Sequence, residues 1–459
     1  MKNYIVYCIS TLALSLTGCA VGPKYHTPSV SVPSVWSDGK TTSIATKEEA
    51  WWRNFHDPLL NELIEQQSVF NLNLQTAQAR IKTARADLAM AKAQFAPIVG
   101  ITALPPSGTG VALTQLIALT TSIQPDIFGR LRQNKQSAKA NLEATEADQN
   151  FAMINLHAEI ATSYLELRQS QAKEIILHNN IGRNSQLLKF IKSRYKQGYD
   201  NYINVAQQDS LIETQLAELA QNKGYSTAII HKIEILTGNN PGLLANKLAP
   251  IKPVPQMNQK INLGMPSELL RRRPDIIAAE RRVAATHANI RVAIASLFPQ
   301  ISIGWLLGWQ SQTIMNNIAA VRNPESTFFG TFNGSLFDLS SYRNIDLKKQ
   351  EKLVAILQYQ IAILSALHDV ETQVNFCKYS QLSVNHLKRA LDQKQLVLKL
   401  SKDTYMKGAT DFNTVLRSEE ELNMLEMSYL NYRVAHQIAI INLYKALGGN
   451  IVNPEGKSK

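Results

Sequence analysis

The sequence lacks the residue patterns that most enzymes and metal proteins need. Its nine histidines are dispersed through 459 residues, and none stands at HExxH or a similar metal-binding spacing. A Walker loop, a dinucleotide-binding fingerprint and a nucleophile elbow are also missing. Met406, Met424 and Met427 would suit a soft metal, although methionine more often serves in packing. We therefore expect no enzyme, no catalytic residue and no bound metal.

Long apolar runs are missing as well. The apolar stretch at residues 353–370 is interrupted by Gln358, Gln360 and His368. A transmembrane helix needs about 20 predominantly apolar residues, so we expect none here. If the chain spans a membrane, it must do so with closed β-strands, because these satisfy their backbone hydrogen bonds within lipid.

The N-terminus carries a signal for export. Lys2 precedes an apolar stretch at residues 4–16, which is too short to span a bilayer, and small residues follow it up to Cys19. This pattern is typical of a secretory signal peptide, here residues 1–18. The cysteine after the small residues has the form of a bacterial lipobox, in which Cys19 carries the acyl chains. An ordinary signal peptide with a coincidental cysteine is the alternative. Ala20, rather than aspartate, favours the outer membrane.

Cysteine itself is scarce. After cleavage only Cys19 and Cys377 remain. If Cys19 is acylated, no intramolecular disulfide can form, so packing must stabilise the fold. The covalent lipid would be the chain's only attached group. The net charge of +12 is spread along expected helical faces, and an exported lipoprotein does not meet nucleic acid. The exception is the run of arginines at 271–273 before Pro274, which we interpret as a loop entering a helix.

Proline and glycine are absent from long stretches. No proline lies between Pro125 and Pro241, and residues 338–407 contain neither residue type. Such stretches, rich in Ala, Leu, Gln, Glu and Lys, predict very long helices. About 65 helical residues reach roughly 100 Å at 1.5 Å per residue. A helix of that length needs neighbours along its flanks, so we expect a bundle or coiled coil.

An internal repeat organises the chain. Residues 80–97 and 282–299 share an arginine, a run of alanines and a terminal proline. Corresponding positions in the two halves are Asp126 and Asp338, Tyr195 and Tyr405, Gly198 and Gly408, and Gly238 and Gly448. The predicted organisation is a lipidated extended segment at 19–59, a first repeat at 60–240, a linker at 241–264, a second repeat at 265–449 and a tail at 450–459.

Each repeat contains a segment in which side chains alternate in character. Ile301, Ile303, Trp305, Leu307 and Trp309 alternate with smaller or polar residues, and similar alternation precedes Asp338 and Asp126. This period predicts β-hairpins at about 98–124 and about 300–337, with loops marked by residues 105–108 and 323–324. One apolar and one small or polar face suit a barrel wall between lipid and a wet lumen. A soluble hairpin packed on the helices is the alternative.

Aromatic residues and strand number refine this hypothesis. Trp305, Trp309 and Phe328 are candidates for an interfacial aromatic girdle. Four strands cannot close a pore by themselves, so strands that span a membrane require an oligomer. The sequence thus predicts a mainly α fold with a small β part.

The sequence resembles the outer-membrane factor family, of which TolC and OprM are familiar members, and within it the lipoprotein branch called NodT-like. The resemblance covers nearly the whole mature chain. The residues that carry it are Gly18 to Tyr25, Trp51, Trp52, Phe55, Asp57 to Leu59, Leu269 to Ile276, Ala279 to Arg281, Phe298, Pro299 and the two Tyr-x-x-Gly turns.

The resemblance implies a homotrimer in the outer membrane, lipid-anchored and spanning, with a large periplasmic extension. Each protomer would give four strands to one β-barrel and four long helical segments to a periplasmic tunnel. It further implies a passive export duct in a tripartite efflux system, which docks on a periplasmic adaptor and an inner-membrane pump, commonly of the proton-driven RND type. The alternatives are a non-conducting coiled-coil lipoprotein and the same fold used for type I protein secretion.

The resemblance also points to the periplasmic tip. In the family the turns at Tyr195 and Gly198 and at Tyr405 and Gly408 would form a closed tip that adaptor hairpins contact. Family members often carry carboxylates six and nine residues past the second glycine. This chain has Thr414 and Arg417 there. The hypothesis is a gate formed by Thr414, Arg417 and Glu420, with Glu419, Glu420 or Glu421 as counter-charges; the alternative is a solvated charged face.

Overall fold

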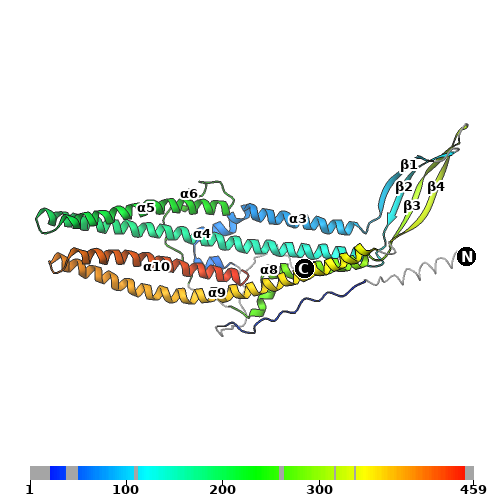
Figure 1. Cartoon of the computed structure of the whole chain (residues 1–459). Coiled ribbons are helices and arrows are strands. Elements are labelled where there is room, and N and C mark those ends of the chain that lie inside the picture. Colours follow the sequence, from blue (N-terminus) through cyan, green and yellow to red (C-terminus); the bar gives the residue numbers. More distant parts are fainter. Residues whose placement is uncertain are drawn as a thin grey trace. The chain divides into compact units, whose positions relative to one another are not determined.

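The computed structural model describes residues 21–37, 50–107, 112–257, 263–314, 317–334 and 338–449 (Figure 1). The chain forms two compact units, and each unit collects segments from both halves of the sequence. The first unit combines the described parts of residues 1–31, 78–148 and 275–362. The second combines those of 32–77, 149–274 and 363–459.

The described residues of the first unit form an antiparallel sheet in the order β1-β2-β3-β4. Its strands are β1 (Ile98–Ser107), β2 (Ala112–Ile123), β3 (Gln300–Ile314) and β4 (Asn317–Asn333). Helices α3 (Leu72–Ala93) and α8 (Pro274–Ala295) precede the two hairpins, and α4 (Arg130–Lys196) and α9 (Leu339–Met406) follow them. The predicted mainly α fold with four strands and an internal duplication is therefore confirmed.

Prolines lie inside two of these strands, where loops were predicted. Pro105 and Pro106 belong to β1, and Pro324 belongs to β4 and pairs with Trp309. That prediction was wrong because β1 and β4 are the edge strands of the sheet. An edge strand can leave one side unpaired, so the missing N–H of proline costs little there. In β1 the register also shifts between Leu104 and Ser107.

The corresponding aspartates of the two repeats start the two longest helices. The carboxylate of Asp126 accepts hydrogen bonds from the backbone N–H groups of Leu131 and Arg132, at 2.9 and 2.8 Å. The carboxylate of Asp338 accepts from the Ser340 N–H at 2.9 Å and from the Ser341 hydroxyl at 2.6 Å. The hydrogen bonds from Ser341 and then Ser340 lower the pKa of Asp338 to about 2. An anion at this position also interacts favourably with the helix dipole.

The second unit contains two long helical hairpins. The later part of α4 pairs with α5 (Tyr202–Leu236), and the later part of α9 pairs with α10 (Phe412–Ala446) (Figure 1). Short elements complete the unit: η1 (Trp51–Phe55), α2 (Pro58–Glu62), η2 (Leu63–Gln67), η3 (Ser68–Phe70), α6 (Ala245–Leu248), η4 (Pro266–Glu268) and α7 (Leu269–Arg272).

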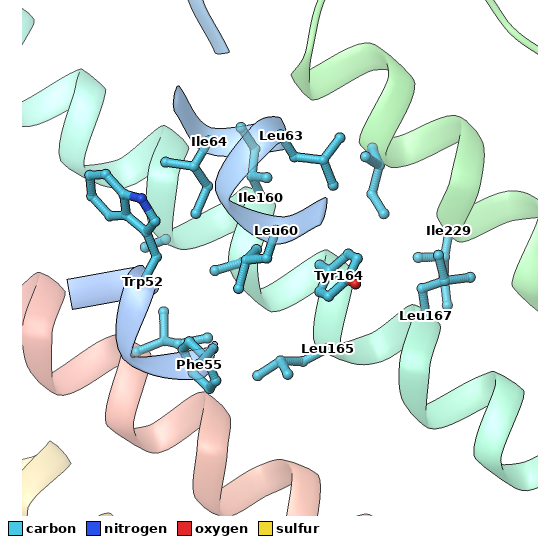
Figure 2. Packing of buried hydrophobic residues seen from close by; sticks show 14 of the residues in the cluster. Trp52, Phe55, Leu60, Leu63, Ile64, Ile160, Tyr164, Leu165, Leu167 and Ile229 are labelled. Carbon is cyan, nitrogen blue, oxygen red and sulfur yellow. The ribbon is translucent and has the colours of Figure 1, made fainter. Parts of the chain in front are cut away.

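The main apolar core of the second unit forms where the short N-terminal elements pack on α4. Figure 2 shows Trp52, Phe55 and Leu60 facing Ile160 and Leu165. The ring of Trp51 stacks on that of Tyr444 in α10, with centroids 5.6 Å apart. The segment with Trp51 and Trp52 therefore packs against both hairpins. We call this segment the N-terminal wedge.

A buried polar chain reinforces this core. The guanidinium of Arg168 is fully buried and donates to the Pro250 carbonyl and the Tyr164 hydroxyl, both at 2.9 Å. The Tyr164 hydroxyl donates to Asp57 at 2.6 Å, and Asp57 also caps α2. A buried cation without such partners would be strongly destabilising. The chain of hydrogen bonds thus fixes the N-terminal wedge and the segment after α6 to α4.

The arginine run before α8 has a structural role. Arg273 is buried, and its guanidinium donates to the Ala446 carbonyl at the end of α10 and to Asp369 in α9, each at 3.1 Å. Pro274 is the first residue of α8, as the sequence predicted. A cation at a helix C-terminus satisfies an unpaired carbonyl and interacts favourably with the dipole.

One helix of the described residues, α9, is long and apolar enough by composition to cross a membrane. Its most apolar window has a mean hydropathy of 1.5, and 28% of that window is buried. A helix that packs against neighbouring helices meets the same criterion, so composition alone is weak evidence of a span. Tyr359, Ile363 and Val370 are buried along one side of the helix, which indicates a packing role.

Acid is expected to destabilise the second unit through His157. Burial lowers the pKa of this imidazole to about 4, and its ring contacts that of Trp52 at 5.0 Å. Between pH 6.5 and 4 the unfolded chain binds a proton that the folded chain excludes, so stability falls by about 3 kcal/mol as the pH drops. Chemical unfolding in detergent at pH 7.5 and 4.5 measures this loss.

His157→Phe should reduce the acid-induced loss. The matched control is His178→Phe in the same helix, because the His178 side chain is largely exposed. Equal acid sensitivity of both variants and the unmodified protein would contradict the role of His157.

Candidate functional site

The sheet exposes one apolar face. The strand register puts alternate residues of all four strands on this face. Its exposed members are Val99, Ile101, Ile117, Leu119, Ile123, Ile303, Trp305, Leu307, Trp309, Phe328 and Phe332. The opposite face carries mostly small or hydroxyl side chains, such as Ser122, Ser302 and Thr331. Soluble monomers rarely expose an apolar patch of this size. A soluble hairpin packed on the helices would bury the face, so that alternative is not supported.

The apolar face has the height of a membrane band. Eight residues separate Ile301 from Trp309, which corresponds to about 26 Å along the strand. Membrane barrels carry an outward apolar band of about 25 Å. Trp305 lies opposite Phe328 midway along this band, and its Nε1 donates to Ser326 at 3.0 Å. Trp309 lies at the end of the band away from the helices. The interfacial role of these three aromatics stays a prediction.

The two Tyr-x-x-Gly segments form equivalent turns between long helices. Gly198 and Gly408 have φ values of +80° and +74°, which side chains rarely tolerate. The Tyr199 N–H donates to the Arg194 carbonyl at 3.0 Å, and the Ala409 N–H to the Thr404 carbonyl at 2.9 Å. This is the Schellman arrangement for ending a helix with a left-handed glycine.

The two equivalent tyrosines have different surroundings. Tyr195 is 44% exposed, whereas Tyr405 is 4% exposed and donates its hydroxyl to Asp200 in the other turn. The Nε of Arg194 lies 3.4 Å from the same carboxylate, and its guanidinium lies over the Tyr405 ring at 5.2 Å. An apolar cluster that includes Ile191 and Phe412 surrounds the tyrosine. Tyr405 thus fastens the α9–α10 turn to the α4–α5 turn.

The electrostatics of this fastening agree with its geometry. Burial would raise the pKa of Asp200, but hydrogen bonds from Tyr405, Asn204 and the Asn201 backbone outweigh it and lower the pKa. Burial and then the bond to Asp200 raise the pKa of Tyr405. Sequence reasoning missed Asp200 and Arg194, because an aspartate beside a helix start usually serves only as a cap.

The candidate gate residues share one face of α10. Thr414, Arg417 and Glu420 are spaced by three positions and are all exposed. Among the described residues, Arg417 makes no hydrogen bond or ion pair. The hydrogen bond from Thr414 chiefly lowers the pKa of Asp411, and Arg417 adds to this effect.

Two of the three proposed counter-charges are already engaged. Glu419 is buried and pairs with Lys402 at 2.5 Å, and Glu421 pairs with Lys394 at 2.5 Å. Glu420 is therefore the acid of the three that stays exposed beside Arg417.

The first described residues of the chain, 21–25, lie along α8. Cys19, the predicted lipidation site, falls outside the described residues. From residue 21 onward the chain is held by Tyr25, whose hydroxyl donates to Glu280 at 2.6 Å, and by the Pro23 carbonyl, 3.0 Å from Nε2 of His287. Within the described part of the chain, no three His, Cys, Asp or Glu side chains converge as a metal site requires.

Tyr405→Phe is expected to loosen both turns, because it removes one partner from the buried Asp200 carboxylate. Losing such a bond costs about 1–3 kcal/mol. Hydrogen–deuterium exchange should accelerate at residues 198–204 and 404–412. The matched control is Tyr195→Phe, the same change at the exposed counterpart. If both variants exchange alike, Tyr405 does not fasten the turns.

Comparisons with known proteins agree with this architecture. The family model for outer membrane efflux protein matches twice, over residues 63–239 and 265–449. Nodulation protein T of Rhizobium leguminosarum bv. trifolii is 27% identical over 98% of this chain and 99% of its own length. The pyoverdine export outer membrane protein OpmQ of Pseudomonas aeruginosa is 28% identical over 98% and 97%.

A solved structure of the outer-membrane channel OprN is also similar. It aligns with a TM-score of 0.87 and 28% identity, covering 94% of this chain and 99% of that one. The family model spans most of the chain, and the relatives match it nearly end to end. The chain belongs to the outer membrane efflux protein family and is an outer-membrane efflux channel with a large periplasmic helical part.

Proposed function

We propose that three copies of this chain form one passive duct, which works with a periplasmic adaptor and an inner-membrane pump to export small molecules. The observation that carries this proposal is the exposed apolar face of a sheet with only four strands. Among the described residues, no strand pairs with the outer edges of β1 and β4, and an open edge is not tolerated in lipid. Twelve strands from three copies would close the barrel and enclose a lumen lined by the small and polar face.

A second apolar stripe on α9 supports assembly. Leu353, Leu357, Ile361 and Leu364 follow one another at helical spacing and are about half exposed or more. They lie on the side opposite the buried stripe described above. A helix with apolar residues on two sides needs partners on both. Neighbouring copies of the chain would cover this stripe.

The N-terminal segment would anchor the duct. We propose that Cys19 is acylated and that the lipid inserts beside the apolar face of the sheet. The contacts of Tyr25 and His287 hold the following segment along α8, so the lipid would add apolar contact without loosening the chain. No catalytic residue or cofactor has a part in this function.

The two glycine turns would receive the adaptor. We propose that the turns at Tyr195 and Gly198 and at Tyr405 and Gly408 form the tip, with Thr414, Arg417 and Glu420 as its gate. Three arginines about 6 Å apart would repel by roughly 3 kcal/mol per pair at an effective dielectric of 20. Glu420 of each copy is the available counter-charge in the closed state.

The gate is tested by Arg417→Asp, which reverses the charge at the constriction. In planar bilayers the variant should favour cations over anions severalfold more than the unmodified channel, because fixed charge at a narrow point selects counter-ions. Lys189→Asp makes the same charge change in α4 and should leave selectivity unaltered. Unchanged selectivity of the Arg417 variant would show that this residue does not line the gate.

The function is tested at the apolar face. Leu307→Arg puts a charge against lipid, at a cost of about 2–4 kcal/mol per copy near the bilayer centre. In cells lacking this channel, the variant should fail to restore tolerance to exported compounds. Thr327→Arg, on the opposite face of the sheet, should restore it.

Native mass spectrometry of the protein from outer membranes reports the assembly directly. A trimer with an acylated Cys19 is expected. A monomer or dimer would contradict the closed duct, and equal behaviour of the two arginine variants in cells would contradict the orientation of the sheet.

A further inference from the structure

The charge of the chain changes abruptly where the sheet meets the helices. Strands β1, β2 and β3 contain no charged residue, and β4 contains Arg322 and Glu325. Each strand is joined to a helix at the same end of the sheet. The sixteen residues next to each strand at this end, 82–97, 124–139, 284–299 and 334–349, together contain eleven basic residues and four aspartates. The basic residues are Lys82, Arg85, Lys92, Arg130, Arg132, Lys135, Lys139, Arg291, Arg343, Lys348 and Lys349. We call this set the basic collar.

Contacts inside the first unit bring these segments to one level. The amide of Asn134 in α4 donates to Gln94, just after α3, at 3.0 Å. The ring of Phe128 stacks on that of Phe298, just after α8, with centroids 4.7 Å apart. The collar residues nearest these contacts, which include Lys92 and Lys135, therefore lie beside the end of the sheet.

Acids pair with four residues of the collar: Asp126 with Arg132 at 3.1 Å, Glu143 with Lys139 at 3.7 Å, Glu146 with Arg85 at 3.3 Å and Glu351 with Lys348 at 2.9 Å. The other seven basic residues outnumber the three remaining aspartates, Asp87, Asp338 and Asp346, so the collar stays positive. Asp126 and Asp338 cap helices α4 and α9, where the helix N-termini already attract their charge. Asp346 is shared between Arg343 at 3.9 Å and Lys349 at 3.4 Å. The Arg343 side chain nevertheless stays 77% exposed.

Some of the remaining basic residues have solvent-exposed side chains. Lys92 and Lys135 are exposed and make no ion pair with any described residue. Exposed aromatic rings, Phe95 and Tyr342, stand close to Lys92 and Arg343 in the chain. Aromatic residues beside lysine and arginine are typical of the headgroup level of a membrane.

We propose that the basic collar binds the phosphates of anionic phospholipids in the periplasmic leaflet of the outer membrane. The inference rests on the proposed function, in which the apolar face of the sheet contacts lipid. Phospholipid phosphates then lie just beyond the end of the apolar band, at the level of the collar. Basic residues at a membrane surface attract anionic headgroups over a distance of about one Debye length. The collar would fix the depth of the channel in the membrane.

The test uses the intact trimer and lipid retention. The collar variant combines Lys92→Gln, Lys135→Gln and Arg343→Gln. The control variant combines Lys189→Gln, Lys196→Gln and Lys399→Gln, which removes the same charge from exposed lysines near the turns of the same helical hairpins. Native mass spectrometry measures how much phosphatidylglycerol or phosphatidylcholine each trimer keeps after delipidation and addition of equal amounts.

The unmodified and control trimers should retain more phosphatidylglycerol than phosphatidylcholine. The collar variant should retain about fivefold less phosphatidylglycerol than the unmodified trimer. A charge-conserving variant with Lys92→Arg, Lys135→Arg and Arg343→Lys should behave like the unmodified trimer. Equal retention of both lipids by the unmodified trimer would overturn the proposal. So would a collar variant that matches the control, or full displacement of the lipid by an equal concentration of inorganic phosphate.

These outcomes are separable from failure of the proposed function. Every sample also reports the trimer mass, and planar bilayers report its conductance. A trimer that conducts but shows no lipid preference would contradict the lipid-binding proposal and leave the proposed duct intact. If the unmodified protein forms no trimer, both the proposed duct and the lipid-binding proposal that rests on it are contradicted.

Discussion

The structure depends on the lateral packing of very long helices. Helices α4 and α9 have 67 and 68 residues, about 100 Å each, and in proteins most of a helix's stability comes from the packing of its apolar face on neighbours. Each must begin at a firm cap, stay free of proline, end sharply and be covered along its flanks. The caps at Asp126 and Asp338 and the turns at Gly198 and Gly408 meet the first and third requirements. The hairpin partners α5 and α10 and the N-terminal wedge around Trp51 cover part of the flanks of the two helices.

Within one chain, part of the apolar surface of the long helices stays exposed to solvent. Part of the apolar surface of the sheet stays exposed as well. Helix α9 buries Tyr359 and Ile363 on one side and exposes Leu357 and Ile361 on the other. The sheet exposes an apolar face and two open edges. Both features have one physical remedy, which is to surround the chain with further copies and with lipid. In the proposed assembly these contacts would both stabilise the chain and enclose the lumen, which the small and polar face of the sheet would line.

Duplication provided two equivalent turns, and small differences gave them separate roles. Tyr405 is buried and bound to Asp200, whereas Tyr195 is open to solvent. Past the second turn, Arg417 and Glu420 occupy the exposed face of α10, while Glu419 is buried against Lys402. One turn can thus hold the pair together while the other presents its aromatic ring. Charge is absent from β1 to β3 and present along the long helices, including the parts beside the sheet and near the turns.

The sequence by itself determined the helices, the repeat and the alternating strands, because these follow from local rules: the absence of proline and scarcity of glycine, equivalent motifs at matching offsets and period-two alternation. It also marked the glycine turns. Only the tertiary structure decided that Pro105 and Pro324 lie in edge strands, since the cost of a proline depends on whether a neighbouring strand needs its N–H. Likewise, Asp200 and Tyr405 are 205 residues apart, and no local pattern links them. Their contact depends on which faces of two hairpins meet, which is settled by burial and packing rather than by neighbours in the chain.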